Sequence, residues 1–310
     1  MCSFNPRAIP HMDLIGQRKR EERAMLSWQV GNVTIKRLVE FEGPLPGGGK
    51  GSMVEEAYPE EVKKIGWLAP HFATEEGHII AAVQALLIET PDKKIIVDTC
   101  VGNDKKRSNP FFNELQTPFL KHLADAGWDR EKVDMVLCTH LHVDHVGWNT
   151  MLVDGEWVPT FPNADYLIAR NEWDHWRKEI DDPDQAPVME DSVHPIFDAG
   201  LAKLVSEDER ISDEIRLMPT PGHTPGHVSI VIESEGKTAI ITGDIMHHPC
   251  QIARPSWASG FDTDQTAARA TRAAFLKEVE GKDILVLGTH FAAPTGGYVR
   301  EEGEGYRFHV

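Results

Sequence analysis

The segment 139–145 (THLHVDH) carries three histidines and one aspartate within its last six residues. It directly follows the apolar run 133–138, which predicts a short buried strand that ends in a loop. His140 and His142 are two residues apart, so in extended backbone both imidazoles point to the same side. The aspartate and the third histidine follow where the chain should turn into a helix, and there they can face a second point nearby. The segment can therefore supply ligands to two neighbouring metal ions. The alternative is a polar loop whose histidines are satisfied without a metal, and so many adjacent polar groups argue against it.

Three further candidate ligands lie where predicted strands end in loops. They are His223 in the turn 219–227 (PTPGHTPGH), Asp244 in 242–244 (TGD) and His290 in 288–290 (GTH). Taken alone, each residue would more often be a turn or surface residue than a ligand. Rigid folds often position functional sites on loops that follow buried strands. Together with the cluster at 139–145, this placement favours a role as metal ligands for all three residues.

The order of the predicted elements indicates a mixed α/β protein in which two sheets lie inside helices. Strands are predicted at 28–42, 78–89, 93–99, 133–138, 164–169, 212–218, 227–234, 237–242 and 284–289, and helices at about 110–126, 170–180, 187–204 and 263–280. The irregular segment 52–78 is expected to cover the site. No linker rich in Pro, Gly or Ser divides the chain, so we expect an N-terminal arm at residues 1–27 and one domain at 28–310.

Composition narrows the classes of partner. The chain has 310 residues, with 49 acidic and 32 basic side chains and a formal net charge of -17. Such a surface repels phosphate backbones and anionic membranes, so we expect neither nucleic acid nor a membrane as a partner. The four cysteines are scattered without a CxxC spacing, and no apolar stretch has the length of a membrane span, so a cytoplasmic location is the default expectation. The charged arm is a weak indication of a homodimer.

The chain resembles the metallo-β-lactamase superfamily in the identity and order of four features. These are the motif HxHxDH, a histidine in the PGHTPGH turn, an aspartate after a strand and a final histidine after a strand. The resemblance covers nearly the whole chain. It implies an αββα sandwich of two mixed β-sheets flanked by helices, with a dinuclear metal site at one edge. By this resemblance the first metal is held by His140, His142 and His223, the second by Asp144, His145 and His290, and Asp244 bridges both.

Two more residues match positions that support the ligand loops in this family. Asp98, in the segment 95–99 (IIVDT), matches an aspartate that steadies the loop carrying the first ligands, and His227 resembles a residue that stabilises its turn. Imidazole and carboxylate ligands without thiolate suit Zn²⁺, and they are also compatible with Mn²⁺, Fe²⁺ or Co²⁺. Two such ions about 3.5–4 Å apart can share a hydroxide and polarise a carbonyl or phosphoryl oxygen, which predicts hydrolysis. Asp144 can serve both as a ligand and as the proton carrier to the leaving group.

Within the superfamily, the segment 243–249 (GDIMHHP) is most similar to acyl-homoserine-lactone lactonases and methyl-parathion-hydrolase-like enzymes. The chain departs from the lactonase pattern at one position. Those lactonases carry a tyrosine three residues after the bridging aspartate, where it contacts the substrate carbonyl, and this chain has His247. His247 either donates to a carbonyl or leaving oxygen, or merely packs.

These observations predict a dinuclear, metal-dependent hydrolase that cleaves a carboxylic ester or a lactone by attack of a metal-bound hydroxide, with Asp144 and His247 as catalytic residues. The alternatives are a phosphotriesterase and a non-catalytic metal-binding protein. The aromatic residues expected either to line the pocket or to pack in the core are Trp67, Phe72, Trp148, Trp257 and Phe261.

Overall fold

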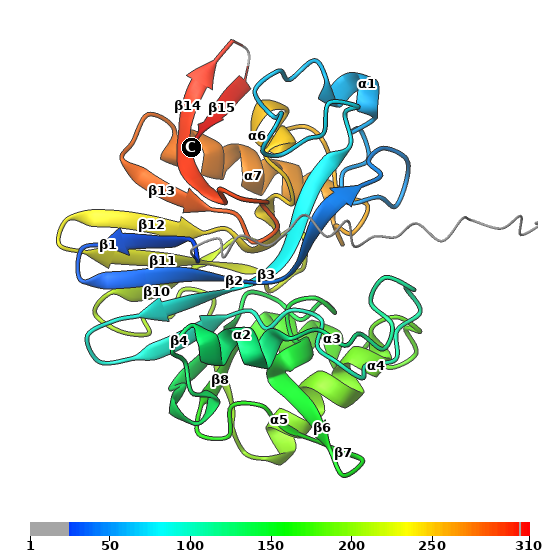
Figure 1. The fold of residues 1–310 in the computed structure, drawn as a ribbon, viewed down its shortest axis with the longest axis vertical. Coiled ribbons are helices and arrows are strands. Elements are labelled where there is room, and N and C mark those ends of the chain that lie inside the picture. Colours follow the sequence, from blue (N-terminus) through cyan, green and yellow to red (C-terminus); the bar gives the residue numbers. More distant parts are fainter. Residues whose placement is uncertain (1–24, 304) are drawn as a thin grey trace, which may run out of the picture.

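Two large sheets pack face to face, with helices on both outer faces (Figure 1), and β6 (Thr150–Val153) and β7 (Glu156–Pro159) form a separate two-stranded sheet. The computed structural model describes residues 25–303 and 305–310. The first sheet has the order β1-β2-β3-β4-β5-β8-β9, with β1 (Ser27–Val30), β2 (Val33–Leu45), β3 (Ile79–Glu89), β4 (Lys94–Val97), β5 (Met135–Cys138), β8 (Asp165–Ala169) and β9 (Ala202–Val205). The second has the order β10-β11-β12-β13-β14-β15, with β10 (Ile215–Pro219), β11 (Val228–Ser234), β12 (Lys237–Ile241), β13 (Ile284–Leu287), β14 (Gly296–Glu302) and β15 (Gly305–His309).

Both sheets are mixed. In the first sheet β4, β5, β8 and β9 run parallel to one another, whereas each pair from β1 to β4 is antiparallel. In the second sheet only the β12–β13 pair is parallel, with Ile241 opposite Leu287. Parallel strands buried on both faces read as continuous apolar runs, which is why β5, β12 and β13 could be located from their sequences.

Three buried apolar clusters fill the spaces between the four layers. The cluster between the sheets draws on both of them, for example Leu137 of β5 and Ile230 of β11. Val136, the neighbour of Leu137, faces the opposite way and joins the cluster under α2 (Phe119–Asp125) and α5 (His194–Asp198). Successive residues of a strand point to opposite faces, so β5 contributes to both clusters.

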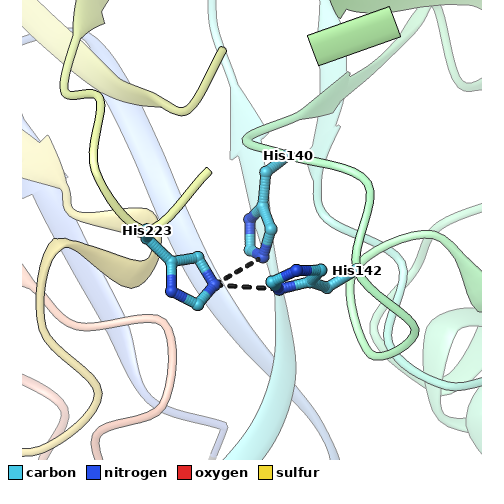
Figure 2. A group of neighbouring side chains, drawn as sticks. All are labelled: His140, His142 and His223. Carbon is cyan, nitrogen blue, oxygen red and sulfur yellow. Dashed lines mark hydrogen bonds between the residues drawn. The ribbon is translucent and has the colours of Figure 1, made fainter. Parts of the chain in front are cut away.

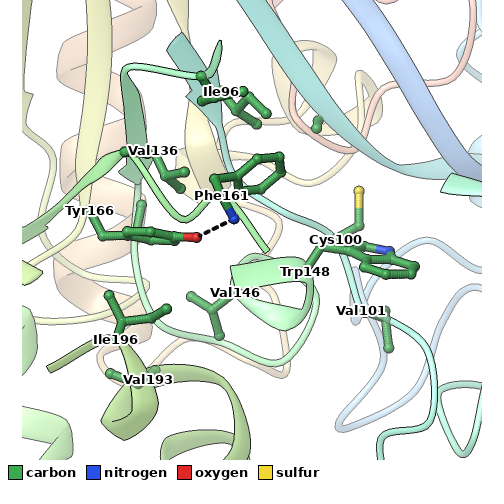
Figure 3. Packing of buried hydrophobic residues seen from close by; sticks show 14 of the residues in the cluster. Ile96, Cys100, Val101, Val136, Val146, Trp148, Phe161, Tyr166, Val193 and Ile196 are labelled. Atoms are coloured by element: carbon green, nitrogen blue, oxygen red, sulfur yellow. Dashed lines mark hydrogen bonds between the residues drawn. The ribbon is translucent and has the colours of Figure 1, made fainter. Parts of the chain in front are cut away.

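The outer cluster of the first sheet is dense with aromatic side chains (Figure 3). Tyr166 of β8 is buried there, and its hydroxyl accepts a hydrogen bond of 3.0 Å from the backbone N–H of Phe161. Trp148 stacks on Phe119 with ring centroids 5.2 Å apart. The indole N–H of Trp148 donates to Glu40 at 2.8 Å. Trp148 is therefore a core residue and does not line the pocket.

The third cluster lies on the outer face of the second sheet. It is covered by α7 (Gln265–Val279), the short α6 (Cys250–Ala253) and the segment 53–73, which contains α1 (Pro59–Val62). Phe72 is buried in this cluster against Phe291 and Phe308. The expected αββα sandwich is thus confirmed, and Phe72 is a packing residue.

Several predicted boundaries were wrong. The strand predicted at 28–42 is a hairpin of β1 and β2, because Gly31 turns the chain with a φ of 55°. The helix predicted at 187–204 is a chain of short pieces, α4 (Ala186–Val188), a π-helical turn (Met189–Val193) and α5, followed by edge strand β9. The helix predicted at 110–126 shrinks to α2, and that at 170–180 shrinks to α3 (Arg170–Trp176). The hairpins β6–β7 (Thr150–Val153, Glu156–Pro159) and β14–β15 were not predicted.

Residues 1–24 of the predicted arm (1–27) lie outside the described residues. The role of the arm and the domain boundary at residue 28 therefore stay predictions. None of the helices in the described part of the chain is both long and apolar enough to cross a membrane.

Candidate metal centre

The candidate ligands gather at one edge of the sandwich because each follows the end of a strand. His140, His142, Asp144 and His145 come after β5, His223 lies in the β10–β11 turn, Asp244 follows β12 and His290 follows β13. The two sheets therefore contribute to one site from opposite sides.

His140, His142 and His223 form the first group (Figure 2). Nε2 of His223 lies 3.2 Å from Nε2 of His140 and 2.9 Å from Nδ1 of His142. A tetrahedral Zn²⁺ with Zn–N bonds of about 2.0–2.1 Å places neighbouring nitrogens about 3.3 Å apart. The donor atoms of this group fit such a metal in type and spacing.

Asp144, His145 and His290 form the second group. Nε2 of His290 lies 3.3 Å from Nε2 of His145 and 3.6 Å from Oδ2 of Asp144. Nε2 of His145 lies 3.7 Å from Oδ1 of Asp144. The side chain of Asp144 is 15% exposed, whereas those of the two histidines are buried. This group presents one carboxylate toward the solvent side of the site.

Asp244 lies between the two groups. Its Oδ2 is 3.2 Å from Nε2 of His290, 3.3 Å from Nε2 of His145 and 3.5 Å from Nε2 of His223. Its Oδ1 is buried and has no hydrogen-bond partner among the described residues. A buried carboxylate oxygen without a partner is costly, and a metal ion on that side would satisfy it.

The electrostatics of the two groups differ. Burial, together with the neighbouring histidines, holds the pKa values of His140, His142 and His223 well below their usual range. Neutral imidazole is the form that binds a metal, so this group is ready to do so at neutral pH. Burial alone would also lower the pKa of His290, but the carboxylates of Asp244 and Asp144 together outweigh burial and raise that pKa to about 9. The paired histidines in turn outweigh burial at Asp244 and keep its pKa well below the usual value.

The two residues expected to support the ligand loops make such contacts. Oδ1 of Asp98 accepts from the backbone N–H of Thr139 at 2.8 Å, and its Oδ2 lies 2.9 Å from Nδ1 of His145. Nε2 of His227 accepts from the backbone N–H of Asp244 at 2.8 Å. Burial lowers the pKa of His227 to about 4, which keeps its ring a neutral acceptor. Both residues thus orient candidate ligands.

Sequence reasoning missed two buried carboxylates that also contact this site. Oδ1 of Asp262 lies 3.0 Å from Nδ1 of His223. Glu172 in α3 accepts hydrogen bonds from the backbone N–H groups of Leu141 and Gly226. Nothing in the sequence separated Asp262 from Asp264, which caps α7, or Glu172 from the other acids near α3.

His247 lies inside the site. Its Nε2 is 3.2 Å from Oδ2 of Asp244, and its ring centroid is 4.8 Å from that of His223. Neither of its ring nitrogens has a hydrogen-bond partner among the described residues. The ring of Phe261, a residue that is 49% exposed, lies 6.2 Å away. Phe261 is therefore the aromatic candidate that contacts the site's histidines and also reaches solvent.

Comparisons with known proteins agree with this geometry. A sequence profile of the metallo-beta-lactamase superfamily matches residues 81–290. An N-acyl homoserine lactonase from Bacillus sp. is 24% identical over 218 residues, which cover 66% of this chain and 79% of the relative. The solved structure of AbOPH, a hydrolase in the beta lactamase superfamily, superposes with a TM-score of 0.75 at 24% identity, over 92% of this chain and 97% of that one. AidC, a dizinc quorum-quenching lactonase, gives a TM-score of 0.74 at 22% identity, over 92% and 96%. Because the profile spans more than half of the sequence and includes the candidate ligands from His140 to His290, the chain belongs to the metallo-β-lactamase superfamily.

Proposed function

We propose that this metal-dependent hydrolase opens a lactone or a related carboxylic ester at a dinuclear centre. The observation that carries the proposal is the pair of three-residue ligand groups that share Asp244. A structural zinc needs four ligands and no open position, so a set of seven convergent side chains favours a catalytic site over a silent one. The lactonases among the relatives favour a cyclic ester over other substrates.

In this proposal His140, His142 and His223 would hold one divalent ion, Asp144, His145 and His290 would hold the other, and Asp244 would lie between the two groups. Such a pair would supply a nucleophilic water by lowering its pKa to about 7, and it would polarise the substrate carbonyl. Zn²⁺ fits the donor set best, because imidazole and carboxylate ligands without thiolate are typical of catalytic zinc.

Asp144 and His247 have the remaining tasks. The partly exposed carboxylate of Asp144 faces the solvent side, where it takes a proton from the nucleophile and delivers it to the leaving oxygen. His247 occupies the position at which similar lactonases carry a tyrosine. Neither of its ring nitrogens makes a hydrogen bond to a described residue, so the single N–H of its neutral ring is available to the substrate carbonyl or the leaving oxygen.

The test is a substrate series on zinc-reconstituted protein, in which kcat/KM is measured for a medium-chain N-acyl homoserine lactone, an aryl carboxylic ester and an aryl phosphotriester. We expect the lactone or the ester to be preferred by at least about 100-fold, which corresponds to roughly 2.7 kcal/mol in the barrier. A preference for the phosphotriester would replace the proposal with a phosphotriesterase, since the same metal pair serves a phosphoryl centre. Absence of turnover with two metals bound would contradict the substrate class.

The variant Asp244→Asn separates a catalytic from a purely structural site. A catalytic protein loses turnover with this change while remaining folded by circular dichroism. A non-catalytic metal-binding protein shows no turnover in either the wild type or the variant.

A further inference from the structure

Glu172 is a buried carboxylate surrounded by hydrogen-bond donors. It lies in the first turn of α3 and is 1% exposed. Its Oε1 accepts from the backbone N–H of Leu141 at 3.0 Å and from the indole N–H of Trp176 at 2.6 Å. Its Oε2 accepts from the hydroxyl of Thr224 at 2.6 Å and from the backbone N–H of Gly226 at 3.1 Å. An ionised carboxylate is an acceptor only, with about four lone-pair positions, and all of them are used here.

The two oxygens hold two different ligand loops. Leu141 is the residue between His140 and His142, and Thr224 directly follows His223. One carboxylate therefore joins the loop after β5 to the β10–β11 turn, which are the two segments that supply the first ligand group.

Gln185 completes the hold on the first of these loops. Its amide nitrogen donates to the carbonyl oxygen of Leu141 at 2.7 Å, so side chains fix both the N–H and the C=O of that residue. The second loop lies directly against α3, because a Cβ added to Gly226 would come within 2.0 Å of the backbone nitrogen of Glu172.

We propose that Glu172 is a positioning residue that sets the spacing of His140, His142 and His223 by tying their two loops together, with Gln185 as its partner on the first loop. Ligand geometry must be held within about 0.5 Å for a metal site to work, and residues behind the ligands typically change metal affinity by about 10–100-fold when they are replaced. This inference rests on the metal binding of the proposed function and not on its substrate.

The substitution Glu172→Gln tests the proposal. Glutamine keeps the shape of the Glu172 side chain but replaces one acceptor oxygen by an NH₂ group. In either orientation of the amide this group faces two donors, so the hydrogen bonds to one of the two loops are lost. We expect one of the two zinc ions to bind about 10–100-fold more weakly and the other to keep its wild-type affinity. The measurement is a titration of metal-free protein with Zn²⁺ against a competing chelator, together with metal content after dialysis.

Equal losses at both metals, or wild-type affinity at both, would overturn the proposal and leave Glu172 with a structural role. A structural role alone would lower the melting temperatures of the metal-free and metal-loaded forms by the same amount. A positioning role instead reduces the difference in melting temperature between the metal-loaded and metal-free forms, because a metal that binds more weakly stabilises the folded state less.

Three other variants complete the test. Glu179→Gln alters an exposed carboxylate just beyond α3 and should leave both affinities unchanged. Thr224→Val and Gln185→Leu each remove a single side-chain hydrogen bond. Each should lower the affinity for the same metal by a few-fold. If Glu172→Gln does not fold, these two variants test the proposal in its place. Wild-type zinc affinity in both would contradict it. Wild-type protein that binds two metals but hydrolyses none of the substrates would contradict the proposed function and leave this metal titration valid.

Discussion

At the scale of single residues, the orientation of three candidate ligand histidines is set by the partner of their Nδ1 atom. Nδ1 of His145 lies 2.9 Å from Asp98, that of His223 lies 3.0 Å from Asp262, and that of His290 lies 2.8 Å from the carbonyl oxygen of Ala82. Such partners fix the tautomer, so that Nε2 carries the lone pair, and a carboxylate partner also makes the imidazole more basic.

The contact of Asp262 gives a prediction at this scale. Asp262→Asn removes the negative charge behind His223, and the new amide must also face the backbone N–H of Ser259, which the carboxylate now accepts at 3.2 Å. We expect zinc affinity to fall by about 10-fold at one metal, as measured by chelator competition. Asp264→Asn is the matched control, because asparagine caps α7 as well as aspartate does. The same affinity in both variants would show that Asp262 does not act through His223.

His247 provides a second prediction. His247→Phe keeps a flat ring beside His223 and Asp244 but removes both ring nitrogens. If His247 donates to the substrate, kcat for a lactone should fall by about 100-fold while two zinc ions still bind. His247→Tyr, which restores a donor, should recover part of the loss. Unchanged kcat in the phenylalanine variant would assign His247 to packing.

At the scale of elements, the sequence was most informative where a strand is buried on both faces. β11, β12 and β13 are short apolar runs, and candidate ligands follow β12 and β13 within a few residues. Local motifs therefore located all seven candidate ligands. Glu172 and Asp262 were missed because their contacts with the ligand loops span 52 and 39 residues, respectively, and only the tertiary fold brings them there. β14 was missed because its sequence (GGYVREE) is rich in glycine and charge.

The segment 53–73 is attached to the site region through His248, which gives a prediction about pH. Its Nε2 lies 2.7 Å from the carbonyl oxygen of Phe72, and its Nδ1 accepts from the backbone N–H of Cys250 at 3.1 Å, so the ring must be neutral. Burial lowers the pKa of His248 to about 4, whereas in the unfolded chain it is about 6.5. The unfolded state thus takes up its proton first, and stability that is complete above about pH 6.5 is lost as the pH falls toward 4.

The loss amounts to about 3 kcal/mol for this residue at the acid end of that range. His248→Gln keeps a donor for Phe72 but has no group that titrates there, so its stability should depend less on pH. The measurement is the urea midpoint of both proteins at pH 7.5 and pH 5, with chelator present throughout so that metal loss does not contribute. Equal pH dependence in the two proteins would contradict this account of His248.

At the scale of the whole molecule, the candidate centre joins the two sheets. His140, His142, Asp144 and His145 belong to the half of the chain that forms the first sheet, and His223, Asp244 and His290 belong to the half that forms the second. Two metal ions would cross-link the halves, and their positive charge would offset part of the net charge of -17. Metal occupancy should therefore affect the stability of the entire fold.

Removal of the metals gives the corresponding prediction. A ligand present at 100 times its Kd stabilises the folded state by about 2.7 kcal/mol, so two zinc sites contribute about 5 kcal/mol. Each kcal/mol shifts the melting temperature by about 2–4 °C in a domain of 150–250 residues, and a larger chain lies at the lower end. Chelation should lower the melting temperature by about 10 °C, and added Zn²⁺ should restore it. Asp244→Asn, which loses the carboxylate charge between both groups, should show a smaller chelator effect. A melting temperature that stays constant while metal analysis records the loss of both ions would mean that each half holds its ligand loops without the metals.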